Sequence, residues 1–166
     1  MEKLKPGFIW TVKEYDQHNN LVAEETTHNL IPIEGLNYIL GASFDGATQY
    51  TDLRVGLTEG NYTPVPADTM ATFPTVATEL TAYTSATRPA LVLGAIAAGN
   101  VDNLDAITEF TGTTDGKQAL GGFITTAAAK GGTTGPLLSA IKFPSPRSLN
   151  NGGRLEVAVA FQFVSV

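Results

Sequence analysis

The side chains that could perform nucleophilic or acid–base chemistry are few in this chain. It contains no Cys and only two His, His18 and His28. A serine nucleophile would need one of these imidazoles as its base, and each falls at a predicted hairpin tip or strand end. No Gly-x-Ser-x-Gly motif occurs. We interpret both His residues as turn or capping residues and expect no enzymatic activity.

Carboxylates could serve glycoside hydrolysis if two of them faced one another across a cleft. The acids in or near predicted strands are Glu24, Glu25, Glu79 and Glu109. Adjacent residues of a strand point to opposite faces, so Glu24 and Glu25 cannot form a pair by themselves. We interpret all four as solvated charges at the rim of the molecule.

Two further patterns could hold a ligand but lack the required spacing. The oxygen-bearing cluster Asn100, Asp102, Asn103 and Asp105 does not fit a twelve-residue calcium loop and is more typical of a turn rich in Asx residues. The glycine pairs at 121–122, 131–132 and 152–153 lack the Lys and the strand-to-helix context of a phosphate cradle. The pair 121–122 lies inside a predicted strand and indicates a bulge or a close backbone approach. We expect no metal ion and no cofactor.

Composition excludes further classes of partner. The formal net charge is −6, and the ten Lys and Arg residues are scattered, so direct binding to nucleic acid is not expected. Residues 1–7 are charged and are followed by an alternating pattern, which does not fit a secretory signal. The longest apolar run, 90–98, is about half of what a helix needs to cross a bilayer of roughly 30 Å. We therefore expect a soluble chain without a membrane segment.

The elements that would position any site are mostly strands. Alternating residues predict strands at 8–15, 21–29, 53–58, 79–86, 105–111, 119–127, 137–143 and 154–166. Ile107 and Phe110 are expected to point inward from the strand at 105–111. Residues 90–98 do not alternate, as expected of a strand buried on both faces, although their length and Ala content leave a helix open. The segment 59–68 reads as a loop, and 69–78 stays ambiguous. Pro32 and the apolar spacing after it predict one short helix at 32–43.

This pattern predicts an all-β fold with one short helix near the N-terminus. Strands of this number and length fit a two-sheet β-sandwich, because a single open sheet would expose an apolar face. We expect one domain over residues 1–166, with a short N-terminal arm at about residues 1–6. In that arm Lys3, Lys5 and Pro6 could contact a partner by adding to a neighbouring sheet, and a disordered terminus is the alternative.

Aromatic side chains offer the remaining binding chemistry. Trp10 alternates with core residues and is expected to be buried. Tyr62 and Pro64 lie in a predicted loop, where they could contact a protein or a glycan.

Several short motifs together resemble one family of virion proteins. These motifs are Pro6-Gly7-Phe8-Ile9-Trp10, the segment from His28-Asn29-Leu30 to Gly35-Leu36-Asn37-Tyr38-Ile39-Leu40, and Leu53-Arg54-Val55-Gly56-Leu57. Glu79-Leu80-Thr81-Ala82-Tyr83 and Ala119-Leu120-Gly121-Gly122-Phe123 extend the similarity over most of the chain. The pattern resembles the capsid decoration, or cement, proteins of tailed bacteriophages.

The resemblance implies a jelly-roll-like sandwich without catalytic residues that acts as a homotrimer. Its partners would be the major capsid protein and further copies of itself, and it would lie on the outer surface of the virion after synthesis in the host cytoplasm. Multivalent attachment of a trimer would convert modest contacts into strong binding. Two alternatives stay open: a glycan- or receptor-binding module of a head or tail fibre, and another tail or connector component.

Overall fold

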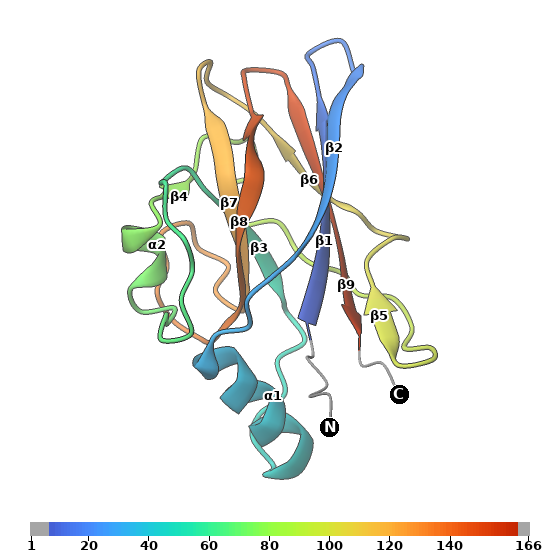
Figure 1. Cartoon of the computed structure of the whole chain (residues 1–166), viewed down its shortest axis with the longest axis vertical. Coiled ribbons are helices and arrows are strands. Elements are labelled where there is room, and N and C mark those ends of the chain that lie inside the picture. The colour runs from blue at the N-terminus through green and yellow to red at the C-terminus, as the bar shows by residue number, and fades with distance from the viewer. Residues whose placement is uncertain (1–6, 163–166) are drawn as a thin grey trace.

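Two antiparallel sheets pack face to face to form the molecule (Figure 1). The computed structural model describes residues 7–162. Their strands are β1 Gly7–Tyr15, β2 Leu21–His28, β3 Arg54–Thr58, β4 Glu79–Leu80, β5 Asn100–Asp102, β6 Thr108–Thr111, β7 Gln118–Thr125, β8 Leu137–Ser148 and β9 Arg154–Gln162. The helices are α1 Ile33–Phe44 and α2 Phe73–Val76. The expected all-β sandwich with a short helix near the N-terminus is confirmed at this level.

The strand order separates the two layers. The first sheet runs β2-β1-β9-β5, and β6 pairs with the other end of β9. The second sheet runs β4-β3-β7-β8. The predicted hairpin of β1 and β2 is confirmed, and β1 also pairs with β9 along its whole length. In Figure 1, α1 and β5 lie at one end of the sandwich, and the β1–β2 hairpin lies at the other.

The main core lies between the sheets. Trp10 is fully buried there, as predicted, and its Nε1 donates a hydrogen bond to Ser139 Oγ at 3.1 Å. A Cβ atom on Gly122 would approach the Trp10 ring to 2.8 Å, and one on Gly121 would lie 2.2 Å from the Ile141 carbonyl oxygen. The β7–β8 register also shifts between Ala119 and Gly121. The glycine pair therefore marks both a bulge and a close approach, which confirms the prediction.

A second, smaller core covers the outer face of the second sheet. It consists of Met70, Phe73, Ala77, Phe123, Leu137 and Ala140. The segment 59–78 forms this cover (Figure 1). Its second half, 69–78, for which the sequence predicted no definite element, contains the short helix α2. Most of β7 is therefore buried on both faces.

Helix α1 is fixed to this layered structure by its first turn. Glu34 accepts hydrogen bonds from the backbone nitrogens of Met70 at 2.8 Å and of Leu137 at 2.7 Å. A Cβ atom on Gly35 would meet the Leu137 carbonyl oxygen at 2.7 Å, so only glycine permits this approach to β8. The helix begins after Pro32, which occupies the N-cap position.

Three predicted elements differ from the structure. Residues 90–98 form neither strand nor helix, because this apolar run has sheet partners only through isolated bridges of Ala90 and Ala97. The predicted strand 79–86 ends at Leu80, where the chain turns away from β3. The strand predicted at 137–143 continues to Ser148, which is possible because β8 is an edge strand and its prolines interrupt no second ladder.

One predicted orientation in β6 is wrong. Phe110 is buried as expected, but Ile107 precedes the strand and is 36% exposed. The alternation of burial extends back to Ile107, and this period of two places Ile107 on the outward face with Glu109, opposite to Phe110.

Tyr83 carries a polar atom that the fold does not satisfy. Its hydroxyl is buried and makes no hydrogen bond within the described part of the chain, and burial raises the pKa of Tyr83 far above its usual range. The ring packs edge-on against Phe110, and Lys130 Nζ lies 3.7 Å from its centroid.

Replacing Tyr83 by Phe should therefore raise the free energy of unfolding by roughly 1 kcal/mol, since it removes an unsatisfied hydroxyl and keeps the ring. Urea unfolding measures the change. Tyr50→Phe is the control, because Tyr50 is exposed and its substitution should stay within about 0.5 kcal/mol of the parent. A Tyr83→Phe protein less stable than the parent would show that the hydroxyl has a partner in solution.

Candidate functional site

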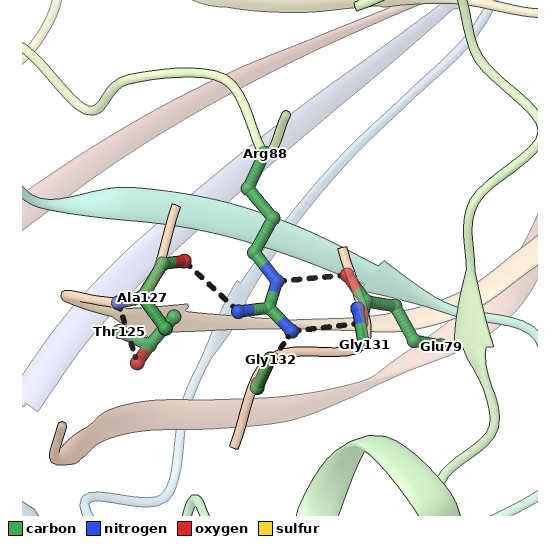
Figure 2. A network of polar contacts seen from close by, with 6 residues as sticks. All are labelled: Glu79, Arg88, Thr125, Ala127, Gly131 and Gly132. Carbon is green, nitrogen blue, oxygen red and sulfur yellow. Dashed lines mark hydrogen bonds and ion pairs between the residues drawn. The ribbon is translucent and has the colours of Figure 1, made fainter. Parts of the chain in front are cut away.

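Glu79 is a buried structural residue, which contradicts its interpretation as a solvated rim charge. It forms an ion pair with Arg88, and the side chains of Glu79 and Arg88 are 3% and 0% exposed (Figure 2). Arg88 Nε and Nη2 each donate to one carboxylate oxygen at 2.8 Å. Such a two-point contact is the strongest geometry available to this pair.

The remaining polar atoms of the pair are also satisfied. Arg88 donates to the carbonyl oxygens of Ala127 and Gly132, both at 2.9 Å, and the Gly131 nitrogen donates to Glu79 at 2.7 Å. The guanidinium carbon lies 5.1 Å from the Phe123 ring centroid. As Figure 2 shows, the network joins β4, the segment after it and the loop that follows β7. The pair holds these segments together and offers no group to a substrate.

The other acids on strands are paired separately. Glu24 lies 3.8 Å from Lys13, and Glu109 lies 3.1 Å from Arg154; both carboxylates are about half exposed, as predicted. Glu25 differs from the prediction because its side chain is only 16% exposed and pairs with Arg147 of β8. This contact closes one side of the sandwich, where β2 approaches the opposite sheet. No two of these carboxylates face one another, so the arrangement does not support glycoside hydrolysis.

The two His residues lie where the sequence predicts them. His18 is in the β1–β2 turn, and its backbone nitrogen donates to Asp16 at 2.8 Å. His28 ends β2 opposite Ile9. No serine side chain is hydrogen-bonded to either imidazole within residues 7–162.

A Ser-x-x-Lys spacing, typical of some serine nucleophiles, occurs at Ser139 and Lys142. Residues three apart on a strand point to opposite faces, and on β8 they do so here. Ser139 Oγ is buried and accepts hydrogen bonds from Trp10 and Asn29, whereas Lys142 Nζ donates to Asn61 at the surface. The spacing therefore forms no catalytic pair.

The Asx cluster organises the chain around β5. Asn103 is fully buried: its amide donates to the Val157 carbonyl oxygen and accepts from the Val159 nitrogen. Asp102 accepts from the Leu104 nitrogen at 3.1 Å, which is an Asx turn as predicted. In the part of the chain that the structure describes, no group of three or more His, Asp or Glu residues is placed to hold a metal ion.

The predicted partner contacts fall into two groups. Lys3, Lys5 and Pro6 lie outside the described residues. Tyr62 and Pro64 are half-buried in the cover of the second sheet. The Tyr62 hydroxyl donates to Asp68 at 2.7 Å, which raises the pKa of Tyr62, and the ring packs edge-on against Phe73. This role in the cover was not predicted, and contact of Tyr62 or Pro64 with a partner stays a prediction.

A surface that the sequence did not indicate lies at the α1 end of the sandwich. We call it the apolar end, and it comprises the exposed side chains Ile33, Leu40, Phe44, Tyr50, Val92 and Ile96. Phe44 and Ile96 are 85% and 81% exposed. These residues come from α1, the segment after it and the loop before β5, which Figure 1 places at the same end.

Tyr50 links the two halves of the apolar end. Its ring centroid lies 5.6 Å from that of Tyr38 of α1, and its backbone nitrogen donates a hydrogen bond to the Tyr38 hydroxyl at 2.7 Å. On the other side, Tyr50 and Val92 line one shallow depression with Leu53 and Leu91. Exposed apolar side chains grouped in this way are typical of a surface that binds another macromolecule.

Within residues 7–162, no helix is both long and apolar enough to span a membrane. Comparisons of the chain with known protein families, with curated proteins and with solved structures found no match.

Proposed function

We propose that this protein is a capsid decoration protein of a tailed bacteriophage. In this role it binds the outer surface of the major capsid protein shell as a homotrimer and reinforces the head against the pressure of packaged DNA. The observation that carries the proposal is the apolar end, six large exposed side chains that lie at one end of the sandwich. The motif resemblance supplies the identity of the partner.

The architecture supports this role in two ways. Two hydrophobic cores and a buried ion pair hold the sandwich together. A protein that bridges shell subunits under pressure needs such an ordered fold. The acidic chain also avoids attraction to the packaged DNA, since its net charge is −6. A jelly-roll relationship is part of the proposal, and the two antiparallel layers are compatible with it.

Binding of purified protein to empty expanded heads tests the proposal. The double variant Phe44→Asp/Ile96→Asp should bind at least about a hundredfold more weakly, because each large apolar side chain contributes roughly 1.5–3 kcal/mol when buried. Both residues are exposed, so circular dichroism and thermal unfolding should match the parent. Co-sedimentation at a series of protein concentrations gives the affinity.

Leu21→Asp/Val76→Asp is the matched control, since both side chains are exposed and lie away from the apolar end, Leu21 at the start of β2 in the β1–β2 hairpin and Val76 in α2. It adds the same charge and should bind as the parent does. Failure of the parent protein to bind heads, or equal weakening by the control, would contradict the proposal. Unchanged heat resistance of virions that lack this product would also contradict it.

A further inference from the structure

A polar cavity lies at the opposite end of the sandwich from the apolar end. Its volume is about 340 Å³, within the range of roughly 300–1,000 Å³ typical of small-molecule sites. Three turns surround it: the β1–β2 hairpin, the turn before β7 and the turn between β8 and β9. Figure 1 shows all three turns at the end away from α1. We call this space the hairpin-end cavity.

Glu14 lines this cavity and is an exception to the apolar pattern of its strand. The buried face of β1 carries Phe8, Trp10 and Val12, and Glu14 is next in the same row. Glu14 is only 9% exposed. Its Oε2 accepts from the Ser148 nitrogen at 3.1 Å, while Oε1 has no hydrogen-bond partner among the described residues. An unpaired carboxylate oxygen that stays accessible, in a mostly buried residue that lines the cavity, can accept a hydrogen bond from a ligand.

The other lining groups define the chemistry of that ligand. They include the carboxylates of Asp16 and Asp115, the amides of Gln17 and Asn151, and the imidazole of His18. Hydrogen bonds from Asn20 hold the pKa of Asp16 below its usual range. No Lys or Arg of residues 7–162 lines the cavity, so phosphate, sulfate and acidic sugars would be repelled.

Both acceptors and donors line the cavity, and this combination favours hydroxyl groups as ligands. A hydroxyl both donates and accepts, so it can use a carboxylate and an amide together, whereas an ammonium group would leave the amide donors unused. Neutral saccharides present several such hydroxyls on a compact ring.

Hydrogen bonds between and within the three turns order the walls of the cavity before any ligand binds. Asn150 Oδ1 accepts from the Gly116 nitrogen at 2.8 Å, and Asp115 Oδ1 accepts from the Asn151 nitrogen at 3.1 Å, so the two turns are tied to each other. In the third wall, Asp16 accepts from the backbone of His18 and Asn20. A site whose walls are already ordered loses little entropy on binding.

We propose that the hairpin-end cavity binds a neutral saccharide unit through Glu14, Gln17 and Asn151. The proposal is independent of shell attachment, which uses the other end of the molecule. A decoration protein fixed by its apolar end would present this cavity to the exterior, where surface polysaccharides are met.

Titration of the full-length protein with glucose, galactose, N-acetylglucosamine and glucuronic acid, followed by amide chemical shifts, tests the proposal. At least one neutral sugar should shift the amides of Gln17, His18 and Asn151, whereas glucuronic acid should not. Glu14→Gln should weaken binding about tenfold or more, because it keeps the shape but replaces a charged acceptor. Glu24→Gln removes the same charge from the surface of β2 and should bind as the parent does.

Gln17→Ala provides a second variant, because Gln17 is exposed in the turn and its loss should leave the fold intact while it weakens binding. Absence of shifts at this end with every neutral sugar, equal binding of glucuronic acid, or shifts centred on the Tyr62 loop would overturn the proposal. Binding only of a lysine-containing peptide would do so too, and would assign the cavity to a protein partner. None of these results depends on whether the protein binds heads.

Discussion

Arg88→Ala should lower the free energy of unfolding by about 3–5 kcal/mol, the cost of leaving one member of a buried ion pair without its partner. The carboxylate of Glu79 would stay buried and keep only the hydrogen bond from the Gly131 nitrogen. The carbonyl oxygens of Ala127 and Gly132 would lose their donor as well. The melting temperature should fall by roughly 10 °C, given about 2–4 °C per kcal/mol for a chain of this size.

Urea unfolding of the parent and the variant measures this effect. Lys13→Ala is the control, because it breaks a solvent-exposed ion pair with Glu24 and should cost no more than about 1 kcal/mol. In the Glu79→Leu/Arg88→Met double variant the unpaired charge is gone, so it should be more stable than Arg88→Ala. A cost for Arg88→Ala no larger than that for Lys13→Ala would show that the pair is open to water in solution.

Gly56→Ala should cost about 3 kcal/mol, at the upper end of what overpacking a core usually costs. A Cβ atom at this position would lie 2.2–2.8 Å from three atoms of the Phe123 ring. The ring cannot withdraw, because it is fully buried and is held between Phe73 at 5.5 Å and the Arg88 guanidinium at 5.1 Å. The added methyl group must therefore displace either β3 or the second core.

A double-mutant cycle with Phe123→Leu identifies the cause. If the clash with the ring is responsible, Gly56→Ala should cost clearly less in the Phe123→Leu background than in the parent. Gly94→Ala is the control, since a Cβ atom there has only an ordinary contact, at 3.5 Å from the Asp102 carbonyl oxygen. Strict additivity of the two substitutions would rule out the proposed contact.

Local patterns were sufficient to predict much of the sandwich. The alternation in β1 and β9 and the turn formers between β1 and β2 depend on neighbours in sequence. These elements form as predicted, and the end of the predicted strand 154–166, after Gln162, lies outside the described residues. The same is true of the helix after Pro32 and of the burial of Trp10. In each case the information lies within a few residues of the element itself.

The features that depend on distant segments could not be predicted in this way. Glu79 meets Arg88 only because the chain turns away after Leu80, and Arg88 is completed by carbonyl groups more than thirty residues further along. Residues 90–98 are apolar but lack a continuous sheet neighbour, so hydrophobicity alone gave the wrong element. The hairpin-end cavity is formed by three turns that are remote from one another in sequence.

The two prolines in β8 have a consequence for the behaviour of the protein at high local concentration. Pro144 and Pro146 lie on the outermost strand of the second sheet, where their missing N–H groups interrupt any ladder that an approaching chain could build. If many copies lie close together on a shell, as proposed, exposed edge strands of neighbouring copies could otherwise pair and form fibrils. The prolines would prevent this pairing, so the position of each copy would depend on its contacts with the shell.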